Sequence, residues 1–148
     1  MSVLRFIKLA VFICVAGFSI EACGNSGPTP IRYGNEQCAH CRMTISDMHF
    51  GCQLVTVKGR TYNFDDVQCM RSFVAEGGIA PGDIARVYLT DYLAGGGLRP
   101  AADFMLLRSE TLRSPMQGNI AAFLTPEGLQ EVQKHHAGEV LTWAGFWE

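Results

Sequence analysis

The residues with the clearest chemical potential are two thiols and a thioether, which lie in the run Cys38-Ala39-His40-Cys41-Arg42-Met43. Thiolates and thioethers are soft ligands, and together they favour soft ions such as Cu(I) over Mg²⁺, Ca²⁺ or Mn²⁺. A thioether binds metal without losing a proton, and it cannot be consumed by a disulfide. Met43 beside the two cysteines therefore predicts a Cu(I) site.

The Cys38-x-x-Cys41 spacing leaves other interpretations open when it is taken alone. It can supply half of a tetrahedral Zn(II) site, with Cys52 and Cys69 as further ligands or His40 and His49 as substitutes. The chain would then be an exported structural zinc module, similar to treble-clef domains, with an interaction role. The pair can also act as a redox dithiol or form a disulfide. Four cysteines, an even number, lie beyond the N-terminal export and anchoring segment described below, which permits two disulfides.

The start of the chain predicts export. A short basic segment precedes an apolar run, Leu9 to Ile20. This run is too short for a membrane-spanning helix, which needs about 20 residues, but it suits a signal peptide. Ala22-Cys23 resembles a lipobox, so we predict a lipoprotein signal peptide over residues 1–22 and lipidation of Cys23. Glu21 places a charge beside the cleavage point and keeps a plain secretory peptide as the alternative.

Residues 23–36 are predicted to be a flexible linker, because their Gly, Ser and Pro content offers little apolar surface to bury. The linker would tether a folded domain to a membrane, outside the cytosol. Thiols in such a compartment tend to be oxidised. A reduced Cys/Met cluster there needs a purpose, and metal handling is the simplest one.

The elements that must position these side chains lie in residues 37–148. We predict one compact α+β domain of two β-β-α-β half-repeats, at about 37–92 and 98–148, with each sheet covered by its own helix. In the first half, a helix begins after Asp65 or Asp66, either of which can cap it. The predicted strands of this half are 52–57, 61–64 and 84–89.

The second half repeats this pattern. Thr125 as N-cap, with Pro126 at the first helical position, is a common helix start, and Gly138 ends that helix. A loop over 93–97 separates the halves. The predicted strands of the second half are 104–107, 119–124 and 139–143.

Other sulfur and carboxylate groups are candidates for the site. Met116 lies in a turn-rich loop and is the candidate metal ligand from the second half. Asp65 and Asp66 are interpreted first as helix caps and second as a polar patch that docks a partner. Three further methionines are predicted to be core residues; they are Met48, Met70 and Met105.

Charge and motif content exclude several function classes. The formal net charge of −2 comes without a basic stripe, so nucleic acid is not an expected partner. The chain has no recognisable nucleophile motif and no Gly-rich phosphate loop, which leaves hydrolysis and nucleotide chemistry without support. We therefore expect a binding protein and not an enzyme.

Taken in order, these motifs resemble the NosL family of nitrous-oxide reductase accessory proteins. The family pattern is a lipoprotein signal, Cys-x-x-Cys-Gly-Met, an aromatic-Phe-Asp-Asp segment before a helix, a Pro-Met-Gly loop and a closing strand. Two positions depart from it, because Arg42 and Gln117 stand where the family has Gly. The matching segments here are 38–43, 62–66, 115–116 and 139–143.

The resemblance implies a pair of β-β-α-β units that binds Cu(I) and delivers copper to maturing nitrous oxide reductase. Cys38 and Cys41 correspond to the family dithiol, Met43 to its adjoining Met, and Met116 to the loop Met. The implied partners are that reductase and its copper-site assembly transporter. The implied location is the periplasmic side of a bacterial membrane, with the lipid on Cys23 as the anchor.

Overall fold

Two β-β-α-β units follow one another along the chain, which confirms the predicted α+β class. The computed structural model describes residues 27–147, so the predicted signal peptide and Cys23 lie outside the described part. The first unit comprises β1 (Cys52–Thr56), β2 (Thr61–Phe64), α2 (Val67–Ala75) and β3 (Ile84–Thr90). The second unit comprises β5 (Met105–Arg108), β6 (Ile120–Phe123), α3 (Pro126–Gln133) and β7 (Glu139–Thr142).

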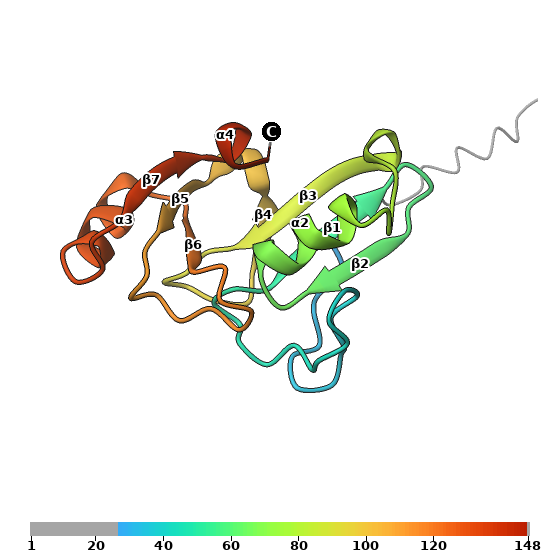
Figure 1. Ribbon diagram of the computed structural model, residues 1–148, viewed down its shortest axis with the longest axis horizontal. Helices are drawn as coiled ribbons and strands as arrows, with labels where there is room; N and C mark the ends of the chain where they lie inside the picture. The colour runs from blue at the N-terminus through green and yellow to red at the C-terminus, as the bar shows by residue number, and fades with distance from the viewer. Residues whose placement is uncertain (1–26, 148) are drawn as a thin grey trace, which may run out of the picture.

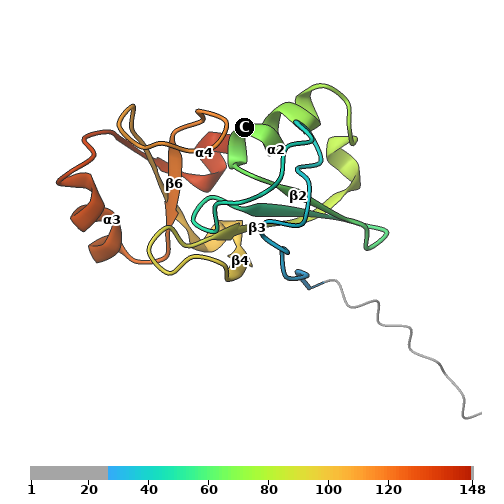
Figure 2. The ribbon, with the colours of Figure 1, turned by 90° about the horizontal axis from the view of Figure 1, so that it is seen from below.

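The two sheets share one strand order. The first strand of each unit is central and pairs antiparallel with the second strand on one side and the third on the other, giving the orders β2-β1-β3-β4 and β6-β5-β7. Strand β4 (Leu98–Pro100) extends the first sheet beyond β3 and is not predicted from the sequence. The two units lie side by side (Figures 1 and 2).

The helix boundaries follow from capping residues that the sequence reveals. Asp66 caps α2 by accepting a hydrogen bond from the Cys69 amide, and Thr125 caps α3 through the Gly128 amide. Gly77, just after α2, has φ of +82°, a conformation that Gly adopts without strain. Short 3₁₀ turns occupy Pro81–Asp83 and Ala101–Asp103.

Part of the predicted linker belongs to the folded domain. Gln53 on the central strand β1 is fully buried, so its amide needs partners. Thr29 supplies them: its N–H donates to Gln53 Oε1 at 2.9 Å, and its carbonyl accepts from Gln53 Nε2 at 2.8 Å. Ile31 is buried as well. The segment from Thr29 onward is therefore held against the first sheet, where the sequence predicts a flexible tether.

The closing strand ends one residue earlier than predicted. Trp143 begins a short helix, α4 (Trp143–Trp147), instead of ending β7. Thr142 explains the change, because its Oγ1 accepts a hydrogen bond from the Gly145 amide at 3.1 Å and so caps the turn. The rings of Trp143 and Trp147 then stack with centroids 5.1 Å apart.

The core comprises two clusters, and the methionines divide between core and surface. Met70 is fully buried in the first cluster, as predicted, and Met105 packs partly buried against the second. The prediction for Met48 is wrong, since its side chain is 46% exposed in a turn that follows no strand or helix period. Within residues 27–147, no helix is both long and apolar enough to cross a membrane.

Candidate metal centre

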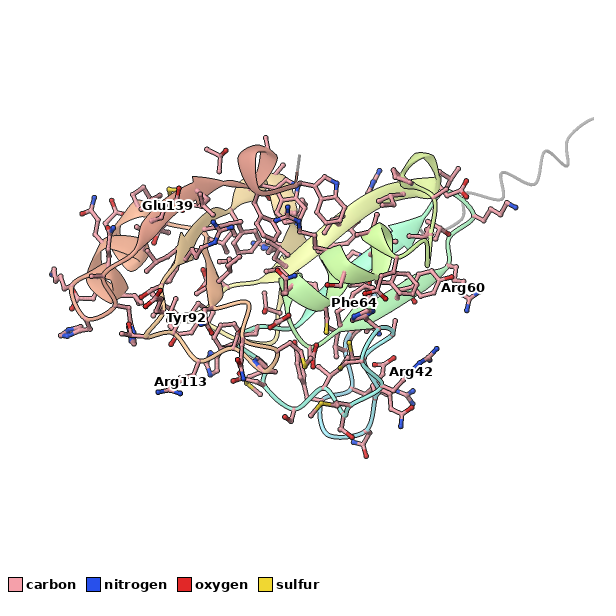
Figure 3. All side chains as sticks on the ribbon, in the orientation of Figure 1. Arg42, Arg60, Phe64, Tyr92, Arg113 and Glu139 are labelled. Atoms are coloured by element: carbon pink, nitrogen blue, oxygen red, sulfur yellow. The ribbon has the colours of Figure 1, made fainter. Side chains whose placement is uncertain are left out.

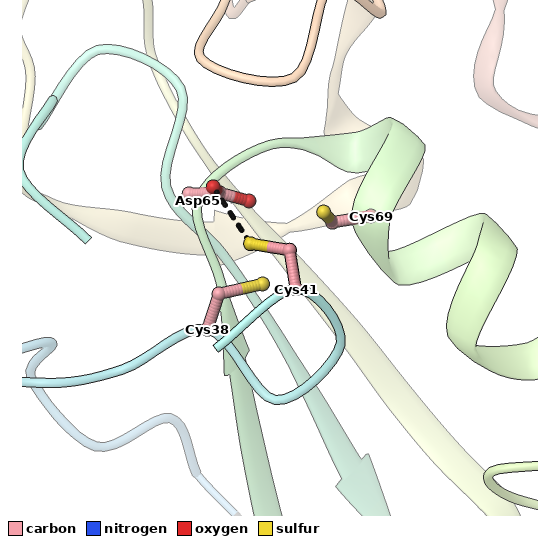
Figure 4. A group of neighbouring side chains, drawn as sticks. All are labelled: Cys38, Cys41, Asp65 and Cys69. Carbon is pink, nitrogen blue, oxygen red and sulfur yellow. Dashed lines mark hydrogen bonds between the residues drawn. The ribbon is translucent and has the colours of Figure 1, made fainter. Parts of the chain in front are cut away.

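Four potential metal ligands from two segments, the cysteine loop and the β2–α2 corner, meet beside the first sheet. They are the thiols of Cys38, Cys41 and Cys69 and the carboxylate of Asp65, and their ligand atoms all lie within 4.8 Å of one another. Figure 4 shows the three sulfur atoms and the carboxylate directed toward a common centre. The two cysteines of the predicted motif thus gain two partners from the β2–α2 corner.

The Cys-x-x-Cys segment is a turn held from both sides by backbone hydrogen bonds. The Cys38 amide donates to the Met43 carbonyl at 2.8 Å, and the Arg42 amide donates to the Cys38 carbonyl at 3.1 Å. The Ala39 amide donates to the Asn63 carbonyl of β2 at 2.8 Å. The last bond fastens the turn to the strand that leads into Asp65, which brings both thiols to the corner. The Arg42 side chain lies exposed on this loop (Figure 3).

The β2–α2 corner supplies the other two ligands. Asp66 caps the helix, which places Cys69 in its first turn beside the cysteine loop. Asp65 lies just before the cap, and its Oδ1 accepts from the Asp66 amide at 3.0 Å. Its Oδ2 accepts from the Cys41 thiol at 3.4 Å, the contact drawn dashed in Figure 4. One short segment therefore gives both a carboxylate and a third thiol.

Neither aspartate is available as the docking patch that the sequence suggests. Asp65 and Asp66 are 2% and 1% exposed, because the corner is covered by the cysteine loop and by the loop around Met116. Buried carboxylates need hydrogen-bond donors, and both find them inside the protein. The cap interpretation holds for Asp66, whereas Asp65 belongs to the ligand cluster.

Burial raises the pKa of the thiols in this cluster. Desolvation, with smaller contributions from Cys38 and Asp65, raises the pKa of Cys41 to about 11, although a hydrogen bond with the Met43 backbone acts in the opposite direction. Desolvation and Asp65 also raise the pKa of Cys69, well above the ordinary range of a thiol. Both thiols are therefore protonated near neutral pH, and a metal must displace these protons.

The fourth cysteine of the domain stands apart from the cluster. Cys52 is fully buried in β1, and burial raises its pKa too, but it is not one of the four clustered ligands. The zinc alternative that pairs Cys52 with Cys69 is therefore wrong in its ligand set. All four cysteines of the described residues are free thiols, so none is in a disulfide.

The predicted methionine ligands occupy two different positions. Met43 is 58% exposed on the cysteine loop. Met116 is half-buried and packs against the core cluster that contains Cys38 and Cys69. Its backbone amide donates to Asp66 Oδ2 at 3.0 Å, which brings the second half-repeat to the same corner.

The centre lies within a segment that matches a known protein family. The sequence profile of the NosL family matches residues 30–146, which cover the whole centre. The chain belongs to the NosL family. The fold also matches the crystal structure of the copper chaperone NosL from Shewanella denitrificans, with a TM-score of 0.66 and 15% identity over 79% of this chain and 93% of that one. No curated protein matches the chain.

The two departures from the NosL pattern lie at strained backbone positions. Arg42 and Gln117 have φ of +67° and +58°, the left-handed region in which Gly carries no penalty and other residues do. The glycines expected there from the family pattern thus have a conformational reason. Both residues retain the left-handed turn without the glycine that favours it.

We predict that Arg42→Gly raises the free energy of unfolding by about 1 kcal/mol, because it removes left-handed strain at φ +67°. Urea denaturation of the metal-free reduced protein measures the change. Arg42→Ala is the control, since it removes the same charge and keeps the strain. An equal gain in both variants would show that charge, and not backbone conformation, is responsible.

Proposed function

We propose that this protein is a Cu(I)-binding chaperone that holds copper at Cys38, Cys41 and Cys69 and passes it to another protein. Three clustered thiols carry the proposal, because thiolate is the ligand type that best suits Cu(I). Met43 and Met116 are the thioether ligands we assign to the same ion. The role is binding and transfer, with no catalysed reaction.

The position of the thiols supports transfer as well as binding. Cys38 and Cys69 are buried, Cys41 is half-buried, and Met43 is exposed on the same loop. An acceptor can therefore approach the ion from the side of Cys41 and Met43. Cu(I) is stable with few ligands, so an incoming ligand can bind before an outgoing one leaves, and copper is never released as a free ion.

We further propose that the acceptor is maturing nitrous oxide reductase, with its copper-site assembly transporter as a second partner. Membership of the NosL family supports this assignment, as does the description of the similar crystal structure as a copper chaperone. The predicted signal peptide supports a periplasmic location, and Cys23 is the proposed lipid anchor.

Metal competition tests the proposed cargo. The anaerobically reduced domain is titrated with Cu(I) against a chromophoric Cu(I) chelator of known affinity, and bound metal is counted after desalting. We expect one Cu(I) per chain to survive the competition. Protein that loses Cu(I) to a modest chelator while its thiols stay reduced would contradict the proposal.

One observation favours Zn(II) as a second candidate ion. Asp65 adds a hard oxygen ligand to the three thiols, and a set of four S and O ligands suits tetrahedral Zn(II) better than low-coordinate Cu(I). In this reading the domain is a structural zinc module that unfolds when zinc is removed.

We predict that Asp65→Asn changes the affinities for Zn(II) and Cu(I) to different extents. It should lower Zn(II) affinity by more than about tenfold. Loss of a residue that only orients a ligand already lowers metal affinity by about 10–100-fold, and loss of a direct ligand should cost at least as much. Cu(I) affinity should change much less, because the three thiols remain. Parallel titrations with each ion measure both constants. A strong Zn(II) preference in the unaltered protein, with unfolding on zinc removal, would favour the structural module.

A further inference from the structure

A single buried carboxylate joins the two half-repeats at the metal centre. Asp66 Oδ1 accepts from the Cys69 amide at 2.9 Å, which caps α2. Its Oδ2 accepts from the Ser114 hydroxyl at 2.8 Å and from the Met116 amide at 3.0 Å. One oxygen thus binds the helix that carries the third thiol, and the other binds the loop that carries the candidate thioether.

The loop around Met116 is shaped to reach this carboxylate. The Ser114 hydroxyl also accepts from the Asn119 amide at 2.9 Å, and Gln117 and Asn119 both adopt left-handed backbone conformations. Gly118 lies against α2 so closely that an added Cβ would come within 2.6 Å of the Gln68 Cβ. The loop is therefore folded back on itself and seated on the first turn of the helix.

We propose that Asp66 is the residue that positions Met116 over the thiol cluster, so that a ligand from the second half-repeat reaches an ion held by the first. This inference rests on the proposed Cu(I) function and adds a role for a residue that touches no metal. Outer partners that orient metal ligands typically change metal affinity by 10–100-fold when they are removed. Asp66 would orient its ligand indirectly, by binding the backbone amide of Met116 and not the thioether side chain.

The chemistry of the carboxylate explains why aspartate is needed at this position. Three donors converge on Asp66, and a carboxylate offers only acceptors. In Asp66→Asn the remaining oxygen can keep the Cys69 cap. The new amide group, however, is a donor that faces the Met116 amide, which is also a donor. The substitution therefore preserves the helix start and breaks the contact with the loop.

A double-mutant cycle tests the positioning role. Cu(I) affinity is measured by chelator competition for the unaltered protein, Asp66→Asn, Met116→Ala and the double variant. We expect each single substitution to lower the affinity by about tenfold or more, and the double variant to lose little beyond Met116→Ala. Such non-additivity is the result expected if Asp66 acts through Met116, because Asp66 then has nothing left to position in the Met116→Ala background. Full affinity in Asp66→Asn, or losses that add, would overturn the inference.

Two further variants keep the test decisive. Ser114→Ala removes the hydroxyl that contacts Asp66 and the Asn119 amide, and it leaves the α2 cap and the Met116–Asp66 bond intact. It replaces Asp66→Asn if that variant fails to fold, and a smaller loss of affinity is expected. Thr125→Ala removes the equivalent cap of α3 and should lower stability without changing Cu(I) affinity. An unaltered protein that does not retain Cu(I) refutes the proposed function itself, whereas normal binding with no effect of Asp66→Asn refutes only the positioning role.

Discussion

Replacing Cys69 by Ala should lower Cu(I) affinity by more than tenfold, whereas the same replacement at Cys52 should leave the affinity unchanged. Cys69 is one of the four clustered ligands, and Cys52 is not. Loss of a thiolate from a three-thiol site removes a direct bond to the ion. Loss of a residue that only orients a metal ligand lowers affinity by about 10–100-fold, so loss of a direct ligand should lower it by more than tenfold.

The two substitutions form a matched pair. Both thiols are free and nearly inaccessible, with Cys69 at 2% and Cys52 at 0% exposure, and both side chains are shortened by the same atom. Each variant should lose about 1 kcal/mol of stability, a typical cost of a core truncation. Chelator competition on the reduced proteins, beside urea denaturation, separates affinity from stability. Equal affinities in the two variants would reduce the site to Cys38, Cys41 and the methionines.

The order of elements could be predicted from the sequence because each half carries local signals. Strand segments rich in apolar and β-branched residues alternate with helices that begin at a capping residue, such as Asp66 or Thr125, and end near glycine. These signals act over a few residues and need no knowledge of the partner strand. Strand β4 lacks them: Leu98–Pro100 is short and contains a proline, and its position depends on pairing with β3.

Half of the ligand cluster depends on three-dimensional contacts that spacing does not reveal. Cys38 and Cys41 are recognisable as a pair because the turn that joins them is local. Cys69 and Asp65 join them through tertiary contacts, among them the Ala39–Asn63 hydrogen bond that fastens that turn to β2. The aromatic-Phe-Asp-Asp segment was the available signal, since it precedes a helix start and places Cys69 one turn from Asp66. Thr29 likewise depends on a distant contact, because its partner Gln53 lies 24 residues away.

Copper affinity should rise steeply with pH. Burial raises the pKa of Cys41 to about 11 and that of Cys69 above the ordinary range, so both thiols are protonated in the metal-free protein across the neutral range. Each thiolate that binds Cu(I) must release one proton, and each released proton makes the apparent affinity rise tenfold per pH unit. Cys41 and Cys69 together therefore predict a rise of about a hundredfold per pH unit, which levels off as the pH approaches the thiol pKa values.

The stability of the metal-free protein should change with pH in the opposite direction to copper affinity, falling as the pH rises above about 8.5. Folding keeps Cys41, Cys52 and Cys69 protonated above the pH at which unfolded thiols ionise, near 8.5. Above that pH the folded state binds more protons than the unfolded state. The free energy of unfolding then falls by about 1.4 kcal/mol per pH unit for each such thiol. Below it, these thiols contribute no pH dependence.

Chelator titrations from pH 6 to 8, corrected for protonation of the chelator, measure the slope of log affinity against pH. Cys69→Ala should lower that slope by one unit, since one fewer proton is displaced, while Cys52→Ala should not change it. A slope that is equal in all three proteins would mean that Cys69 stays protonated when copper binds. The ion would then lie at the cysteine loop alone, and the thiol on α2 would be a buried neighbour of the site and not a ligand.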